Sequence, residues 1–213
     1  MKRITASLVA VLLFVATSLP AQTVTGWNVI AQLLRKSTVF VQAGQSSCTG
    51  FVINDSAKDK KGNDVDLVLT AAHCDCTELY ADQRPTTIRT KDVQKDLMVL
   101  EVEDLDRPAL KLAKTNPAIG DEVASFGYGY GLERPVFRVA HISDDNIYIP
   151  FEGIGGPLIA IDASFVPGQS GGPVVNQSGE VVMIVQLGTP IVGFGVGAET
   201  IKDKVGKFFG AKK

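Results

Sequence analysis

The sequence predicts an all-β fold. From about residue 23 to residue 196, short β-branched runs alternate with turn residues, as in antiparallel strands joined by short loops. The chain has 213 residues, is 45% hydrophobic and contains 21 glycines, which suits one globular unit or two small ones packed together. Its formal net charge of -2 gives no sign of a nucleic-acid partner.

The first 21 residues are typical of an export signal. Lys2 and Arg3 precede an apolar run over about 6–19, and Pro20 ends that run. The run is shorter than the roughly 20 residues that span a bilayer comfortably. We therefore expect cleavage after Ser18 or Ala21, and a mature chain 22–213 in the periplasm or outside the cell with no stable membrane insertion.

The strands are expected to form two β units of similar size. Prolines, a glycine and lysines interrupt the pattern at 107–121, which divides the chain into a unit at about 23–112 and another at about 118–198. The expected strands are 38–42, 50–53, 65–70, 97–102, 122–126, 136–142, 174–175, 181–186 and 192–196.

Only the C-terminal end, at about 199–209, has convincing helical periodicity. Ile201, Val205 and Phe208 fall on one face, with lysines elsewhere. A basic membrane-binding helix would share this pattern. We expect the commoner arrangement, a helix packed on the second β unit.

The chain has two histidines, which limits the choice of a general base. His73 follows the apolar run 67–69, Thr70 and two small alanines, so its ring is expected at a strand end with space around it. His141 lies inside the expected strand 136–142, where a half-exposed structural histidine is the simpler interpretation. His73 is therefore the favoured base.

A carboxylate that orients the base is expected at Asp96. This residue enters the apolar run 97–100, so its side chain could reach the far ring nitrogen of His73. Asp92 is the nearest alternative, but polar Gln94 and Lys95 follow it, and we rank it below Asp96.

A nucleophile is expected at Ser170, within the segment 168–173 (Gly-Gln-Ser-Gly-Gly-Pro). Gly168 allows the backbone to turn so that the N–H groups of Gly168 and Ser170 converge as an oxyanion hole. The Gly-x-Ser-x-Gly spacing also occurs in α/β-hydrolases, which place their histidine after the serine. No histidine follows Ser170, so that triad cannot form.

The order His73, Asp96, Ser170 is that of chymotrypsin-like proteases, and further segments agree with it. These are 118–123 leading to 126–129, then 161–164 and 193–196. The chain resembles a trypsin-like (chymotrypsin-fold) serine protease, most of all the HtrA-type protease domain without PDZ domains. Over nearly the whole mature chain, the resemblance implies two six-stranded antiparallel β-barrels, the triad between them and a C-terminal helix.

The resemblance also implies the chemistry. The expected function is a serine endopeptidase that cleaves polypeptides through an acyl-enzyme and needs no cofactor. Two alternatives stay open, namely a catalytically silent binding module and an esterase on the same fold.

For substrate binding, the resemblance places Ser164 near the base of the P1 pocket and pairs Gln186, Leu187 and Gly188 with an extended substrate. No acid occupies the pocket base, which disfavours Arg or Lys at P1 and favours small or medium apolar residues. Gln169 replaces the acid that trypsin-type zymogens use to bind a new N-terminus. Activation through that ion pair is therefore not expected.

Three cysteines permit three single disulfides. Cys48 and Cys74 match a disulfide of the chymotrypsin-like proteases, which would leave Cys76 unpaired. A metal site formed by these cysteines and His73 is not expected, because His73 is better used as a base and few other ligands exist.

Overall fold

The computed structural model describes residues 26–149 and 155–210, so the expected signal segment 1–21 lies outside the described residues. Six strands form the first β unit: β1 (Thr38–Ala43), β2 (Ser46–Lys58), β3 (Asp64–Thr70), β4 (Leu79–Ala81), β5 (Arg84–Asp92) and β6 (Leu97–Val102). Six form the second: β7 (Glu122–Gly127), β8 (Val136–Ile147), β9 (Leu158–Ile161), β10 (Pro173–Val175), β11 (Val181–Gly188) and β12 (Gly193–Gly197).

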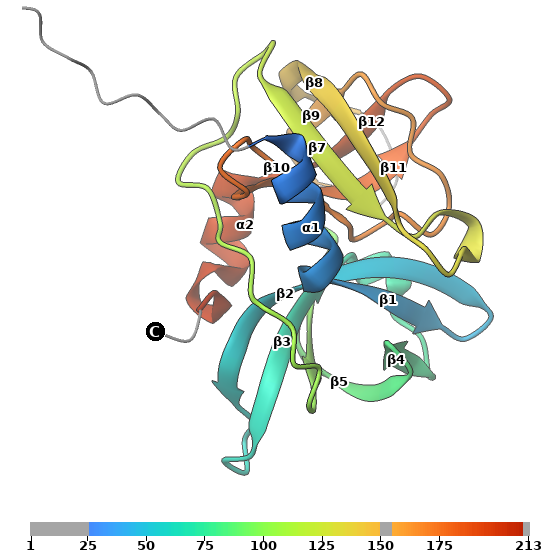
Figure 1. The fold of residues 1–213 in the computed structure, drawn as a ribbon, viewed down its shortest axis with the longest axis vertical. Coiled ribbons are helices and arrows are strands. Elements are labelled where there is room, and N and C mark those ends of the chain that lie inside the picture. Colours follow the sequence, from blue (N-terminus) through green and yellow to red (C-terminus); the bar gives the residue numbers. More distant parts are fainter. Residues whose placement is uncertain (1–25, 150–154, 211–213) are drawn as a thin grey trace, which may run out of the picture.

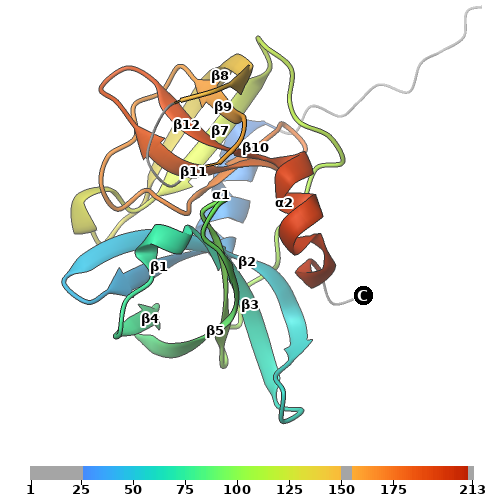
Figure 2. The ribbon, with the colours of Figure 1, turned by 180° about the vertical axis from the view of Figure 1, so that it is seen from behind.

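Each set of strands closes into a barrel. The first barrel has the strand order β1-β2-β3-β6-β5-β4, and the second has the order β10-β11-β12-β9-β8-β7. All of the strand pairs within the two barrels are antiparallel. The predicted pair of six-stranded antiparallel barrels is therefore confirmed, and Figures 1 and 2 show one barrel lying against the other.

Three strands lie outside the strands expected from the sequence, for two physical reasons. Strand β5 carries mostly polar, exposed or half-buried side chains, so it lacks the apolar run that marks a buried strand. Strand β4 has only three residues, which is too short for a periodic signal. Strand β9 is fully buried but has only four residues, which is too short for a clear periodic signal.

The expectation that only the C-terminal end is helical is wrong. Helix α1 (Trp27–Ser37) precedes the first barrel and buries Ile30 and Leu34, which are four residues apart and share one face. This segment falls within the range from about residue 23 that was expected to be β-structure. The C-terminal helix is confirmed as α2 (Ala198–Val205), which buries Ile201 and Val205 and ends in a short 3-10 turn, Gly206–Phe208.

A shared hydrophobic core holds the two barrels together. It joins Phe51 and Leu69 of the first barrel to Phe126 and Ile184 of the second. Both helices add apolar side chains to this cluster, among them Leu34 of α1, and Figures 1 and 2 show them at the junction of the barrels. Because the cluster is close-packed, it fixes the barrels relative to one another, and any site between them has a rigid frame.

Within the described segments, no helix has the length and apolar character needed to cross a bilayer.

Candidate active site

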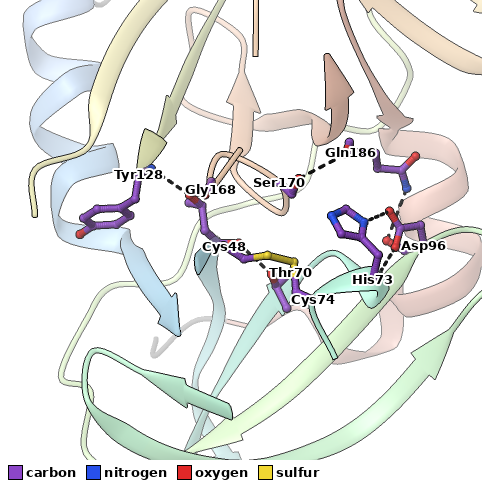
Figure 3. The surroundings of a disulfide bond; sticks show 10 residues. Cys48, Thr70, His73, Cys74, Asp96, Tyr128, Gly168, Ser170 and Gln186 are labelled. Atoms are coloured by element: carbon purple, nitrogen blue, oxygen red, sulfur yellow. Dashed lines mark hydrogen bonds and ion pairs between the residues drawn. A yellow bond between two sulfur atoms is a disulfide. The ribbon is translucent and has the colours of Figure 1, made fainter. Parts of the chain in front are cut away.

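His73 and Asp96 form a doubly bonded pair at one edge of the first barrel. The Nδ1 atom of His73 lies 2.7 Å from Oδ2 of Asp96, and the backbone N–H of His73 donates to Oδ1 of the same carboxylate at 2.7 Å. The Asp96 side chain is 6% exposed and the His73 side chain 48% exposed. The buried carboxylate therefore fixes a half-exposed imidazole that lies toward Ser170 in Figure 3.

Strand pairing brings these two residues together. Strand β3 ends at Thr70, which lies opposite Met98 of β6, so the short 3-10 turn Ala72–Cys74 is beside the start of β6. Asp96 has a positive φ of 52°, and its carbonyl accepts a hydrogen bond from the N–H of Ala72 at 3.2 Å. The alternative acid, Asp92, instead accepts the N–H of Lys95 at 2.9 Å. Asp92 thus closes the turn that presents Asp96.

Ser170 lies across from His73 (Figure 3), in the loop that leads into β10. Its carbonyl accepts the N–H of Thr49 at 2.8 Å, so the loop is hydrogen-bonded to β2 of the first barrel. The Thr49 hydroxyl also donates to the carbonyl of Gly168 at 2.8 Å and accepts the N–H of Tyr128 at 2.9 Å. Thr49 therefore ties the serine loop to both barrels.

The serine loop leaves two amide donors without an acceptor among the described residues. Gly168 has a φ of +96°, in the left-handed region that favours glycine. Within the described part of the chain, neither the N–H of Gly168 nor that of Ser170 donates to another residue. The N–H of the intervening residue, Gln169, donates to the carbonyl of Val166 at 3.1 Å. The side-chain oxygen of Gln169 accepts the N–H of Val166 at 3.0 Å. Gln169 is 2% exposed and closes its own turn as a neutral residue, whereas a carboxylate buried there would need a compensating charge.

The hydroxyl of Ser170 donates to the carbonyl of Gln186 at 3.2 Å. In Figure 3 the imidazole of His73 lies between Asp96 and the serine loop. The hydroxyl must therefore exchange the Gln186 carbonyl for the imidazole before it can lose its proton. Hydrogen bonds of this kind commonly tighten only when substrate is bound.

The Gln186 side chain connects β11 of the second barrel to the turn of the first barrel that carries Asp96. Its Nε2 group donates to the carbonyls of Lys95 at 2.6 Å and Asp96 at 3.4 Å. Gln186 is 3% exposed, and its Oε1 atom is buried without a hydrogen-bond partner among the described residues. The amide cannot be reversed, because its oxygen would then face two carbonyl oxygens. The sequence signal was a glutamine that ends the apolar run 181–185.

Cys48 and Cys74 form a disulfide, the pairing that the resemblance implied. It joins β2 to the residue after His73, as Figure 3 shows. Cys76 is outside this bond, and its Sγ donates to the carbonyl of Glu78 at 2.8 Å. Ligand atoms of Cys48, His73 and Cys74 lie within 4.8 Å of one another, but the disulfide uses both sulfurs that a metal would require as thiolates.

The residues expected to bind substrate line the same wall as Ser170. Gln186, Leu187 and Gly188 form the end of β11, and Gly188 pairs with Gly193 of β12. Ser164 lies in the segment before the serine loop, where its carbonyl accepts a hydrogen bond from the Arg138 guanidinium. Burial, followed by the nearby Asp82 carboxylate, raises the pKa of Tyr128, so its phenol is neutral and supplies no competing base.

Comparisons with known proteins identify the family of the chain. The family model described as a trypsin-like peptidase domain matches residues 48–184. A probable periplasmic serine endoprotease, DegP-like, from Hahella chejuensis is 33% identical over 151 residues, which are 67% of this chain and 30% of that protein. The chain thus spans about 30% of the length of this curated relative.

Two solved structures share the fold. The Rv3671c protease from M. tuberculosis, in its active form, has a TM-score of 0.68 at 23% identity, covering 86% of this chain and 85% of that one. The HtrA-type protease AlgW with a tripeptide has a TM-score of 0.70 at 18% identity, covering 84% of this chain and 63% of that one.

Proposed function

The chain belongs to the trypsin-like peptidase family, and from this premise we propose that it is an exported serine endopeptidase with Ser170 as nucleophile, His73 as base and Asp96 as orienting carboxylate. The observation that carries the proposal is the doubly bonded His73–Asp96 pair opposite Ser170. The curated relative from Hahella chejuensis is described as periplasmic, which supports export to the periplasm.

Each proposed role follows from a hydrogen bond. Asp96 accepts the Nδ1–H of His73, which leaves Nε2 as the unprotonated acceptor in the neutral ring. On substrate binding, the Ser170 hydroxyl leaves the Gln186 carbonyl and turns to Nε2, which takes the proton as Oγ bonds to the peptide carbonyl carbon. The N–H groups of Gly168 and Ser170 receive the negative oxygen.

The proton on His73 then passes to the departing amine as the peptide C–N bond breaks, and an acyl-enzyme remains on Ser170. Water attacks the ester carbonyl and gives a proton to His73, and the imidazole returns it to Ser170 as the carboxylic acid product leaves. No metal or organic cofactor has a role in these steps.

Labelling with a fluorophosphonate tests the proposal directly. We expect the reagent to label wild type at Ser170 and to leave Ser170→Ala unlabelled, because only an activated serine attacks it. Ser178→Ala is the matched control, since Ser178 is an exposed serine in a turn of the same barrel. Folded wild type that takes no label would exclude the proposal.

One observation favours a second candidate, a catalytically silent binding module. In the structure the Ser170 hydroxyl is hydrogen-bonded to Gln186 and not to the base. This candidate predicts no labelling and ligand binding unchanged by Ser170→Ala. A peptide library and a series of esters, both read by mass spectrometry, then separate the endopeptidase from an esterase on the same fold.

A further inference from the structure

The end of the β11–β12 hairpin presents a face without side chains. Gly188 and Gly193 are cross-strand partners, so their Cα–H bonds point to the same side of the sheet. Gly188 is two residues from Gln186, whose carbonyl accepts the Ser170 hydroxyl. This bare face therefore begins beside the nucleophile.

Phe165 occupies that face. A Cβ atom on Gly188 would lie 2.6 Å from both the Cβ and the carbonyl oxygen of Phe165, and 2.8 Å from its backbone nitrogen. A Cβ atom on Gly193 would collide with Cδ2 and Cε2 of the Phe165 ring. The phenylalanine is 6% exposed, so its ring is inserted against both glycines and sealed from solvent.

The segment that carries Phe165 also shapes the serine loop. Val166 follows it directly and is bonded to Gln169 through both its carbonyl and its N–H. The Arg138 guanidinium donates to the carbonyl of Ser164 on the other side. Phe165 is thus held between two fixed neighbours, and a rotation of its ring alone cannot clear the space.

A substrate bound for attack by Ser170 must direct one side chain into this space. Its main chain is expected to pair with residues 186–188, and its reacting carbonyl must lie at the Ser170 hydroxyl. The side chain on the acyl side of the scissile bond, P1, then points between the hairpin end and the segment 164–168. Phe165 already fills the volume that a long P1 side chain would need.

We infer that Phe165 is the residue that determines specificity in this cleft, and that it restricts P1 to glycine or alanine. The inference rests on the proposed endopeptidase function and narrows its substrate class. A buried phenyl ring removes a space that a leucine or phenylalanine side chain would otherwise occupy. Overpacking such a pocket costs enough to exclude the larger residue, since one methylene is worth roughly 10- to 200-fold in rate. The cationic Arg138 at the neighbouring carbonyl further disfavours lysine and arginine at P1.

The test compares kcat/KM for a series of fluorogenic peptides that differ only at P1, with Gly, Ala, Val, Leu, Phe, Glu and Lys. The proteins are wild type, Phe165→Ala and Phe165→Leu, each as the full chain. Phe194→Ala is the matched control. Phe194 follows Gly193 in β12, and its ring packs against the shared core, so this variant removes a phenyl ring away from Phe165. Fluorophosphonate labelling of Ser170 is measured in every protein.

We expect wild type to cleave after Ala or Gly at least about tenfold faster than after Leu or Phe. Phe165→Ala should raise cleavage after Leu and Phe about tenfold or more, with the Ala substrate changing less than about threefold. Phe165→Leu, which keeps the core filled, should shift the preference part of the way. Phe194→Ala should keep the wild-type preference.

Two results overturn the inference while the proposed function stands. One is that wild-type protein, which the fluorophosphonate labels at Ser170, prefers Leu, Phe, Glu or Lys at P1. The other is an unchanged P1 profile in both Phe165 variants that still label at Ser170. Absence of labelling in folded wild type overturns the proposed function itself, and the inference with it.

Discussion

Each barrel contains a histidine–aspartate pair built in the same way. In the first barrel, Asp96 accepts the backbone N–H of His73 at 2.7 Å and contacts Nδ1 at 2.7 Å. In the second, Asp162 accepts the backbone N–H of His141 at 2.5 Å, and its other oxygen lies 3.2 Å from Nδ1. The pairs share a bonding pattern, so the pattern alone does not define an active site.

Burial and surroundings separate the two pairs. The Asp96 side chain is 6% exposed, whereas that of Asp162 is 50% exposed. His73 faces the serine loop, while the Nε2 atom of His141 lies 3.8 Å from the carboxylate of Glu122. A buried carboxylate exerts a stronger and less screened influence on its imidazole than a solvated one. A histidine–aspartate pair therefore suits a catalytic base only where the carboxylate is buried and a nucleophile faces the imidazole.

The largest effect expected is the loss of activity in Asp96→Asn. The amide cannot stabilise the imidazolium or impose the required tautomer, so kcat should fall about 10⁴-fold. Asp162→Asn, the same change in the other pair, should alter kcat less than about twofold. Initial rates on a library peptide that wild type cleaves give kcat for both variants. Equal losses in the two variants would remove the distinction between the pairs.

A second prediction concerns the covalent support of His73, which the His141 pair lacks. The Cys48–Cys74 disulfide spans a sequence separation of 26, and its loss should lower the free energy of unfolding by about 3 to 4 kcal/mol. Urea unfolding of wild type and of Cys48→Ala/Cys74→Ala measures the difference. Cys76→Ala is the control, because Cys76 is free. A double variant as stable as wild type would show that the bond is dispensable.

A third prediction tests Gln186 as a positioning residue for Asp96. Gln186→Met keeps the size of the side chain but removes the donor to the carbonyls of Lys95 and Asp96. We expect stability to fall by about 1–3 kcal/mol, and kcat to fall about tenfold with KM nearly unchanged. Gln177→Met controls for the loss of an outer amide, which donates to Glu122 at 3.1 Å. A purely structural role would leave kcat unchanged in the folded fraction.

The smallest effect concerns the pH dependence of stability at the second pair. The hydrogen bond from the backbone N–H of His141 lowers the pKa of Asp162, and burial opposes that shift only in part. Because the folded-state pKa is depressed, the stabilisation is complete above the ordinary aspartate pKa and is lost as the pH falls below it. In Asp162→Asn, the free energy of unfolding should therefore fall less steeply as the pH decreases below about 4 than it does in wild type. Urea unfolding at several pH values measures this difference. The same pH dependence of the free energy of unfolding in both proteins would contradict the prediction.

Local patterns predicted much of this molecule. The alternation of short apolar runs and turns predicted most strands, and the closed barrels confirm the resulting fold. The acid at position 96 was favoured over Asp92 because an apolar strand follows it, and in the structure it is Asp96 that contacts His73. Helix α1 was missed although Trp27, Ile30 and Leu34 have helical spacing, because the strand pattern of the following residues was extended back over this segment.

By itself, the sequence determined the order His73, Asp96, Ser170, the glycine at 168 and the absence of an acid at 169, because residue type and chain order are local properties. Only the tertiary structure decided that the Ser170 hydroxyl bonds to Gln186, that the Gln186 amide reaches across to Asp96 and that Phe165 fills the space beside Gly188 and Gly193. These contacts join residues that are brought together when the barrels close and pack. Their geometry depends on the packing of the whole core, which no short sequence window contains.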